Sequence, residues 1–220
     1  MIICSGSHQP LRKNFKRMKI IAIGRNYIDH AKELNNPVPD NPVIFMKPDT
    51  ALLKDNKDFY YPEFSQDVHY EVEVVFRVCN EAKHVSPKFA YKYVDAIGLG
   101  IDFTARDIQS IHKEKGLPWE LAKSFDHSAV ISPLFPKEDF PDLKNIAFSL
   151  KKNGETVQSG NTKDMIFDID SLIVFISKYI TLRKGDLIYT GTPVGVGPIV
   201  VGDKFEGFIQ DNPVFSCQIK

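Results

Sequence analysis

The sequence predicts an α+β fold in which a mostly antiparallel or mixed sheet is interrupted by a few helices. Short runs of β-branched and apolar residues, separated by turn residues, recur from residue 19 to the C-terminus. Asn153-Gly154 between two such runs is a typical hairpin turn. The stretch from Asp168 to Ile180 places its apolar residues on one face at helical spacing, which predicts an amphipathic helix.

The first half of the chain is expected to alternate strands with short helices. The expected strands are residues 19–24, 43–46, 68–78 and 96–103. The expected helices are residues 26–35, ending before Asn36-Pro37, residues 87–93, beginning after Ser86, and residues 104–115, closed by Gly116. The second half is expected to be mainly strands, at residues 148–152, 155–158, 187–190, 204–209 and 214–219.

The composition is that of an ordinary globular protein. Of the 220 residues, 43% are hydrophobic and 25% charged, and 28 Lys and Arg balance 28 Asp and Glu. This zero net charge gives no electrostatic reason to expect nucleic acid or an anionic membrane as a partner. No apolar run is long enough to span a bilayer. The three cysteines form no Cys-x-x-Cys pair, which favours a reducing, cytoplasmic location.

Residues 1–17 differ in texture from the remainder. They hold four basic residues and no acidic one, a composition compatible with a transit peptide. Because the segment has no clear amphipathic period, we interpret it as a disordered extension, or as sequence upstream of a start at Met18. Residues 18–220 are expected to form a single domain.

Three acidic residues are candidates for a metal site. Glu71 and Glu73 lie two residues apart in an expected strand, so their side chains face the same side. Taken alone, the pair also fits the solvated face of an edge strand. Asp102, however, follows six apolar or glycine residues, a position that surface solvation explains poorly. If the two strands are neighbours, the three carboxylates converge and suit a hard cation such as Mg²⁺ or Mn²⁺.

Other polar residues are candidates for contacts beside this site. Arg106 and Gln109 share a face of an expected helix and can bind a substrate carboxylate and carbonyl, but Arg106 can equally pair with Asp107. Lys123 lies among apolar neighbours. It is either close to a metal-bound carbonyl, where it stabilises developing negative charge, or extended into solvent.

Two further features have both a functional and a structural interpretation. His30 and Glu33 are three residues apart on an expected helix and form either a general-base dyad or a surface contact. The sequence Thr190-Gly191-Thr192-Pro193 makes a tight loop after a strand, but it lacks the Gly-Lys-Ser/Thr of a P-loop. Its backbone N–H groups and the Thr192 hydroxyl can bind a small carboxylate.

Five motifs, in this order, resemble the fumarylacetoacetate hydrolase superfamily, in particular its branch of small acylpyruvate hydrolases and 2-hydroxyhepta-2,4-diene-1,7-dioate isomerase-like proteins. The motifs are Gly24-Arg25-Asn26-Tyr27 with Asp29-His30, His69-Tyr70-Glu71-Val72-Glu73, residues 102–107, residues 123–126 and residues 190–197. The resemblance covers residues 18–220. It implies a mixed β-sheet roll of the family's C-terminal-domain type with a few flanking helices, usually assembled as a homodimer.

The resemblance also implies roles for individual residues. Glu71, Glu73 and Asp102 are the expected ligands of Mg²⁺ or Mn²⁺. The expected substrate contacts are Arg25, Arg106, Gln109, Lys123 and Thr192. His30 and Glu33 match a catalytic pair on a lid segment, and Lys123 is the third catalytic residue. The fourth acidic ligand and the N-terminal domain of the larger, eukaryotic-type members have no counterpart here, which argues against fumarylacetoacetate itself as the substrate.

The expected activity is the metal-dependent hydrolysis of a carbon–carbon bond in a small keto acid, an acylpyruvate. His30 would activate the water, and a metal-stabilised enolate would form. Decarboxylation of oxaloacetate and isomerisation of a keto–enol or 2-hydroxy-dienoate acid at the same site are alternatives, because all three reactions need that enolate. A non-catalytic metal-binding assembly protein is a further alternative, which the intact candidate residues disfavour.

Overall fold

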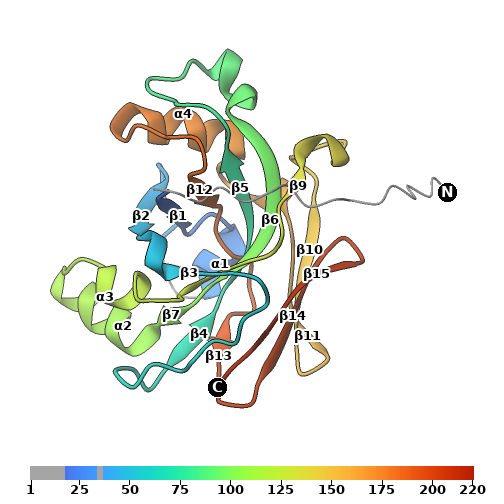
Figure 1. The fold of residues 1–220 in the computed structure, drawn as a ribbon. Coiled ribbons are helices and arrows are strands. Elements are labelled where there is room, and N and C mark those ends of the chain that lie inside the picture. The colour runs from blue at the N-terminus through green and yellow to red at the C-terminus, as the bar shows by residue number, and fades with distance from the viewer. Residues whose placement is uncertain (1–17, 34–36) are drawn as a thin grey trace.

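A mixed sheet forms the centre of the protein in this computed structural model, which describes residues 18–33 and 37–220 (Figure 1). Its strands lie in the order β2 (Val43–Lys47), β1 (Ile20–Gly24), β12 (Leu187–Tyr189), β5 (Val72–Val78), β6 (Val94–Asp102), β8 (Ala129–Ile131) and β3 (Leu52–Leu53), with β9 (Phe135–Pro136) also paired to β6. The pairs β1–β12 and β3–β8 are parallel and the others antiparallel, so the predicted mixed sheet is confirmed.

Two smaller sheets complete the strands. One has four antiparallel strands, β11 (Glu155–Asn161), β10 (Ala147–Lys152), β14 (Lys204–Ile209) and β15 (Asn212–Gln218), and lies to the right of β5 and β6 in Figure 1. The other contains β13 (Gly197–Pro198), β4 (Val68–Tyr70) and β7 (Thr104–Ala105). The main buried cluster joins one face of β5, through Val72, Val74 and Phe76, to apolar residues of the four-stranded sheet such as Phe148 and Phe205. Burial of both faces explains the nearly continuous apolar sequence of β5.

The helices flank the sheets. Helix α4 (Ile169–Tyr179) buries its apolar stripe, and the Asp168 carboxylate caps it by accepting a hydrogen bond from Ser171 N at 2.8 Å. Helix α2 (Arg106–Lys115) ends at Gly116, whose φ of 65° is the left-handed conformation that glycine adopts most easily. The remaining helical segments are α1 (Ile28–Glu33), α3 (Glu120–Lys123), η1 (Asp49–Ala51), η2 (Pro87–Tyr93), η3 (Lys137–Asp139) and η4 (Thr162–Asp164).

The structure corrects three of the predicted elements. The expected strand at residues 68–78 is two strands, because the chain leaves the three-stranded sheet after Tyr70 and joins β6 from Val72 onward. The expected helix at residues 104–115 begins only at Arg106, since the two preceding residues pair with β4 as β7. Residues 87–93 form a 3₁₀ helix, and Ser86 makes no side-chain capping bond. The division of residues 68–78 and the later start of the helix could not be predicted, because an apolar pattern does not reveal which partner a strand takes.

Some predictions fall beyond the described part of the chain. The extension at residues 1–17, which includes Cys4, and the end of the expected helix at residues 34–36 lie outside the described residues. Within the described residues, no helix combines the length and apolar character that crossing a membrane requires. Cys79 and Cys217, the described cysteines, are both free thiols.

Candidate metal centre

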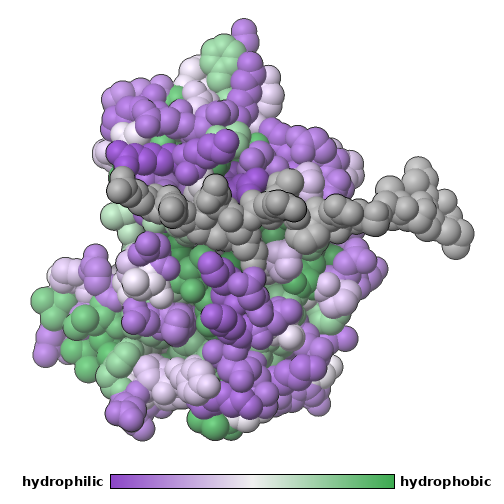
Figure 2. All heavy atoms as spheres, viewed as in Figure 1, coloured by the Kyte–Doolittle hydropathy of each residue, from purple (hydrophilic) through white to green (hydrophobic). Residues whose placement is uncertain are grey.

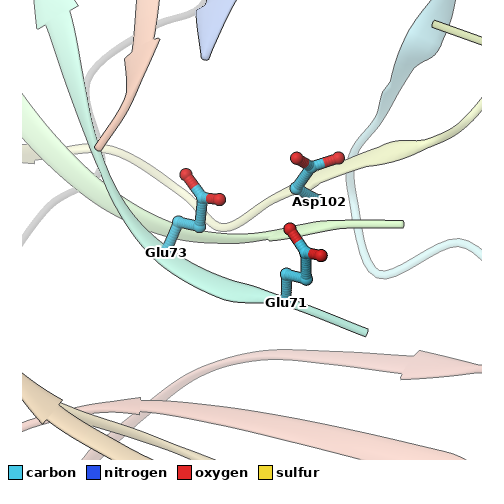
Figure 3. A group of neighbouring side chains, drawn as sticks. All are labelled: Glu71, Glu73 and Asp102. Carbon is cyan, nitrogen blue, oxygen red and sulfur yellow. The ribbon is translucent and has the colours of Figure 1, made fainter. Parts of the chain in front are cut away.

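The carboxylates of Glu71, Glu73 and Asp102 point toward one another where β5 and β6 run side by side (Figure 3). The backbone N–H of Asp102 donates to the Glu71 carbonyl at 2.8 Å, which holds the two chain segments in register. One oxygen of each carboxylate lies within 4.8 Å of those of the other two. The side chains are buried, with 5% or less of each residue exposed, so the solvated-face interpretation is wrong. The predicted convergence of the three groups is present.

The carboxylates of Glu71, Glu73 and Asp102 form a triad whose electrostatics favour a cation among them. Burial, followed by the charges of Asp102 and Glu71, raises the pKa of Glu73 well above its ordinary value. Burial also acts to raise the pKa of Glu71, but the charges of Lys123 and Arg106 outweigh it and hold that pKa below its ordinary value. Three carboxylates without a sulfur or imidazole ligand are the donor set of a hard divalent ion. The residues therefore fit Mg²⁺ or Mn²⁺.

Lys123 lies at the centre of the site, not in solvent as one interpretation of the sequence allowed. Its ammonium group donates to Glu71 Oε2 at 2.8 Å, to Asp102 Oδ2 at 2.7 Å and to Thr104 Oγ1 at 2.5 Å. Burial acts to lower the pKa of this amine, but the charges of Asp102 and Glu71 outweigh it and raise the pKa above its ordinary value. Lys123 is therefore a fixed positive charge at neutral pH.

A second buried lysine was not predicted. Lys47, at the end of β2, lies with its ammonium nitrogen 2.8 Å from Asp102 Oδ1 and forms an ion pair with it. It also donates to Ser128 Oγ at 2.9 Å and to the Lys123 carbonyl. The signal in the sequence was a lysine that directly follows the apolar residues of a strand, where a neutral residue is more usual. Lys47 thus contacts both Asp102 and the backbone that carries Lys123.

Arg106 and Gln109 also contact the triad. The Arg106 guanidinium forms an ion pair with Glu71 through Nη2 and donates to Gln109 Oε1 at 2.6 Å through Nη1. Asp107, the alternative partner of Arg106, accepts hydrogen bonds from Ser65 Oγ and from a backbone N–H. Since Arg106 occupies the amide oxygen of Gln109, the amide nitrogen of Gln109 is left to donate elsewhere.

His30 and Glu33 form the contact expected from their spacing, at 3.0 Å between Nδ1 and Oε2. His30 is only 5% exposed, so this is not a contact between two surface side chains. Glu33 also accepts a hydrogen bond from Gly195 N at 3.0 Å, which links helix α1 to the loop after β12. With Nδ1 held by the carboxylate, Nε2 is the ring nitrogen left to face the cavity.

A cavity that opens to solvent joins these groups. Every predicted site residue lines it except Glu33, which contacts His30. The cavity is also lined by residues that were not predicted to belong to the site, namely Ile23, Gly24, Phe45, Lys113 and Trp119. Burial, then the charges of Arg25 and Arg106, lowers the pKa of Lys113, so several cationic side chains share this space. Such a cavity suits a small anion.

Residues 19–220 match the family model described as fumarylacetoacetate (FAA) hydrolase C-terminal. The chain is 43% identical over 190 residues to the Bos taurus protein named "Oxaloacetate tautomerase FAHD1, mitochondrial", with 86% of each chain covered. It is 44% identical over 185 residues to the Dictyostelium discoideum protein named "Oxaloacetate decarboxylase, mitochondrial", with 84% of this chain and 85% of the relative covered.

One of the similar solved structures contains a bound metal ion. The fumarylpyruvate hydrolase of Pseudomonas aeruginosa, solved in complex with Mn²⁺ and pyruvate, superimposes with a TM-score of 0.89 at 29% identity. The match covers 100% of this chain and 98% of that one. The predicted α+β roll is confirmed by this similarity together with the family match.

Proposed function

The chain belongs to the fumarylacetoacetate hydrolase C-terminal family of metal-dependent enzymes, and from this premise we propose that it interconverts the keto and enol forms of oxaloacetate. The observation that carries the enolate chemistry of this proposal is Lys123, a buried ammonium group held between two carboxylates of the triad and open to the cavity. The names of the relatives that are 43% and 44% identical support oxaloacetate as the substrate. They support this alternative better than the acylpyruvate hydrolysis that we first expected.

The charges of the cavity suit the two carboxylates and the 2-oxo group of oxaloacetate. Arg25, Arg106, Lys113 and Lys123 all line it, and Gln109 and Thr192 add neutral hydrogen-bonding groups. Arg106 is held by Glu71 and Gln109 in a fixed orientation, which favours recognition of a carboxylate without further ordering. Mg²⁺ or Mn²⁺ held by Glu71, Glu73 and Asp102 would supply Lewis-acid polarisation of the substrate oxygens.

Tautomerisation moves one proton between C3 and the 2-oxygen of the substrate and breaks no bond of the carbon skeleton. In the proposed role, His30 Nε2 takes the proton from C3 while Glu33 stabilises the imidazolium through Nδ1. The Lys123 ammonium group stabilises the negative charge that develops on the 2-oxygen. The His30 imidazolium then gives its proton to the 2-oxygen, which returns His30 to its neutral form, and the reverse sequence regenerates the ketone.

Two other reactions remain candidates at the same site. Decarboxylation of oxaloacetate, supported by the name of the Dictyostelium relative, releases carbon dioxide and leaves the enolate of pyruvate for Lys123 to stabilise. Hydrolysis of an acylpyruvate is supported by the structural similarity to fumarylpyruvate hydrolase, and in that reaction His30 would activate a water molecule. The three reactions therefore differ in what His30 does and in what is released.

A parallel assay distinguishes these reactions. The purified protein is incubated with Mg²⁺ or Mn²⁺ and, separately, with enol-oxaloacetate, with oxaloacetate in its keto form and with fumarylpyruvate. With enol-oxaloacetate, we expect the enol absorbance to fall faster than it does without the protein, and we expect no release of carbon dioxide. Pyruvate together with carbon dioxide would favour the decarboxylase, and pyruvate together with fumarate would favour the hydrolase.

The role of His30 has its own test. His30→Ala is expected to lower kcat for tautomerisation by roughly 10²- to 10⁴-fold, the usual contribution of a positioned general base. Its affinity for Mn²⁺, measured by isothermal titration calorimetry, is expected to match that of the unchanged protein, because His30 is not one of the three proposed ligands. Full activity of His30→Ala would exclude the dyad mechanism.

We also propose the homodimer that the family resemblance implies. Figure 2 shows hydrophobic residues gathered over α2 and α3, and Ile111, Leu117 and Leu121 are exposed there. Apolar surface of this kind is often buried between identical chains. Light scattering during size-exclusion chromatography is expected to give twice the chain mass of 25.0 kDa. The names of the Bos taurus and Dictyostelium discoideum relatives place those two proteins in mitochondria. For this chain, a mitochondrial location is therefore as well supported as the predicted cytoplasmic one.

A further inference from the structure

Gln158 connects the four-stranded sheet to the cavity, although no sequence motif singled it out. It lies in β11 and is 2% exposed. Its amide oxygen accepts a hydrogen bond from Val72 N at 2.9 Å, and Val72 is the residue between Glu71 and Glu73. Its amide nitrogen donates to Thr192 Oγ1 and to the Pro193 carbonyl, each at 2.9 Å. One side chain therefore holds both the strand of the triad and the loop that carries Thr192.

The orientation of this amide is fixed by its two backbone partners. A backbone N–H can only donate, so the Gln158 group facing Val72 must be the oxygen. A carbonyl can only accept, so the group facing Pro193 must be the nitrogen. The same nitrogen faces the Thr192 hydroxyl, whose oxygen must accept this hydrogen bond. A flipped amide would place oxygen against oxygen and N–H against N–H, which excludes the alternative assignment.

This arrangement decides the role that is left to the Thr192 hydroxyl. A hydroxyl carries one proton, and here its oxygen already accepts from Gln158. In the part of the chain that the structure describes, Thr192 Oγ1 has no acceptor of its own, and Thr192 lines the cavity. We propose that Gln158 is a positioning residue that fixes the Thr192 hydroxyl as a hydrogen-bond donor to a carboxylate or enolate oxygen of the substrate. This inference rests on the proposed function, because it requires an anionic keto acid in the cavity.

The loop that carries Thr192 packs closely on β11 around Gln158. A Cβ atom added to Gly195 would lie 2.4 Å from the Val157 carbonyl, and one added to Gly160 would lie 2.9 Å from Pro193 Cγ. On both sides of Gln158, the loop and the strand therefore lie too close together for a side chain at these two glycines. A hydroxyl held in such a position loses little rotamer freedom when it binds a substrate oxygen.

A double-mutant cycle with pyruvate as the ligand tests the inference. Gln158→Met removes the amide, Thr192→Val removes the hydroxyl, and affinities for pyruvate are measured by calorimetry in the presence of Mn²⁺. We expect each single variant to weaken pyruvate binding about 10-fold, the loss of one hydrogen bond to a charged group. In the double variant the affinity is expected to match that of Thr192→Val, since Gln158 acts through the hydroxyl. The KM for oxaloacetate should follow the same pattern, with kcat much less affected.

A purely structural role predicts a different result. In that case the losses in pyruvate affinity would multiply in the double variant, which would overturn the inference. Thr162→Val is the matched control, because it removes side-chain hydrogen bonds to the Ile146 N–H and the Leu143 carbonyl, and neither of these groups belongs to the loop. It is expected to lower the melting temperature without changing pyruvate affinity.

The inference can still be tested if Gln158→Met does not fold, and its failure can be distinguished from failure of the proposed function. If Gln158→Met does not fold, Gln158→Glu keeps an acceptor for Val72 N–H, and its loss of affinity is expected to be greater with Thr192 present than in the Thr192→Val background. Equal losses in the two backgrounds would overturn the inference. Failure of the unchanged protein to bind pyruvate or oxaloacetate would overturn the proposed function together with this inference, whereas binding without coupling would overturn this inference alone.

Discussion

At the scale of single residues, the three carboxylates of the cavity are paired unequally with its cations. The ion pairs are Lys123–Glu71, Lys123–Asp102, Lys47–Asp102 and Arg106–Glu71. Among the described residues, Glu73 has no cation within ion-pair distance and accepts a hydrogen bond from Gly191 N at 2.7 Å. A buried carboxylate without a cationic partner is costly. A divalent ion would therefore relieve Glu73 more than it relieves the other two ligands.

The pair of variants Glu73→Gln and Glu71→Gln tests this difference. With metal removed by EDTA, Glu73→Gln is expected to leave the free energy of unfolding unchanged or to raise it, because it relieves burial and repulsion of a charge. Glu71→Gln is expected to lower it by about 3 kcal/mol, since Lys123 and Arg106 lose a buried partner. Urea denaturation measures both values. Equal destabilisation by the two variants would contradict the unequal pairing.

Lys47 is expected to matter for stability although it does not line the cavity. Lys47→Met removes the cation beside Asp102 Oδ1 and the donor to Ser128 Oγ, which should lower the free energy of unfolding by about 3–5 kcal/mol. Lys83→Met is the control, because Lys83 is an exposed lysine that donates to backbone carbonyls at the surface. Its expected cost is within about 0.5 kcal/mol. A similar cost for both lysines would show that Asp102 does not depend on Lys47.

At the scale of elements, the loop between β12 and β13 joins most parts of the site. Gly191 N donates to Glu73, Thr192 lines the cavity, and Gly195 N donates to Glu33. A one-residue shift of this loop would therefore disturb a metal ligand, a substrate contact and the His30 dyad together. Its close packing against β11 is what prevents such a shift.

Gly195→Ala is expected to disturb this loop, and Gly202→Ala provides a matched control. The two glycines have nearly the same φ, 101° and 100°, so the backbone strain of alanine is equal in both. Only at Gly195 would the added Cβ meet a backbone atom, the Val157 carbonyl at 2.4 Å, whereas nothing lies within 4 Å at Gly202. We expect Gly195→Ala to cost at least about 1 kcal/mol more in unfolding free energy and to lower activity at least 10-fold relative to the control. Equal activities would show that the loop position is not critical.

At the scale of the whole molecule, a bound cation would connect the strands on which the fold is built. Glu73 lies in β5, Asp102 in β6 and Glu71 between β4 and β5, so a divalent ion on all three would stabilise the folded chain relative to the unfolded one. The expected gain at a metal concentration 100 times the dissociation constant is about 2.7 kcal/mol. Thermal unfolding with Mg²⁺, Mn²⁺ or EDTA should show this as a rise in melting temperature. Glu73→Gln should lose most of the rise, and a full rise in that variant would argue against the triad as the ligand set.

The sequence by itself determined most of the elements and the chemical class of the site. The turn Asn153-Gly154 and the apolar stripe of residues 168–180 act through local geometry, so they favour a hairpin and a helix at these positions. The isolated position of Asp102 after an apolar run indicated a buried acid for the same kind of reason. The ordered motifs indicated the family, which the match over residues 19–220 confirms.

Tertiary structure alone decided which groups touch. Strands β4 and β5 are separated at Glu71 because the chain changes partner strands there. Partner strands are selected by long-range packing, which a local pattern does not encode. Lys47 and Gln158 were missed because each is separated in sequence from the groups it holds, by 55 residues from Asp102 and by 86 from Val72. Periodicity identifies the face on which a side chain lies, but only the packed chain brings distant faces together.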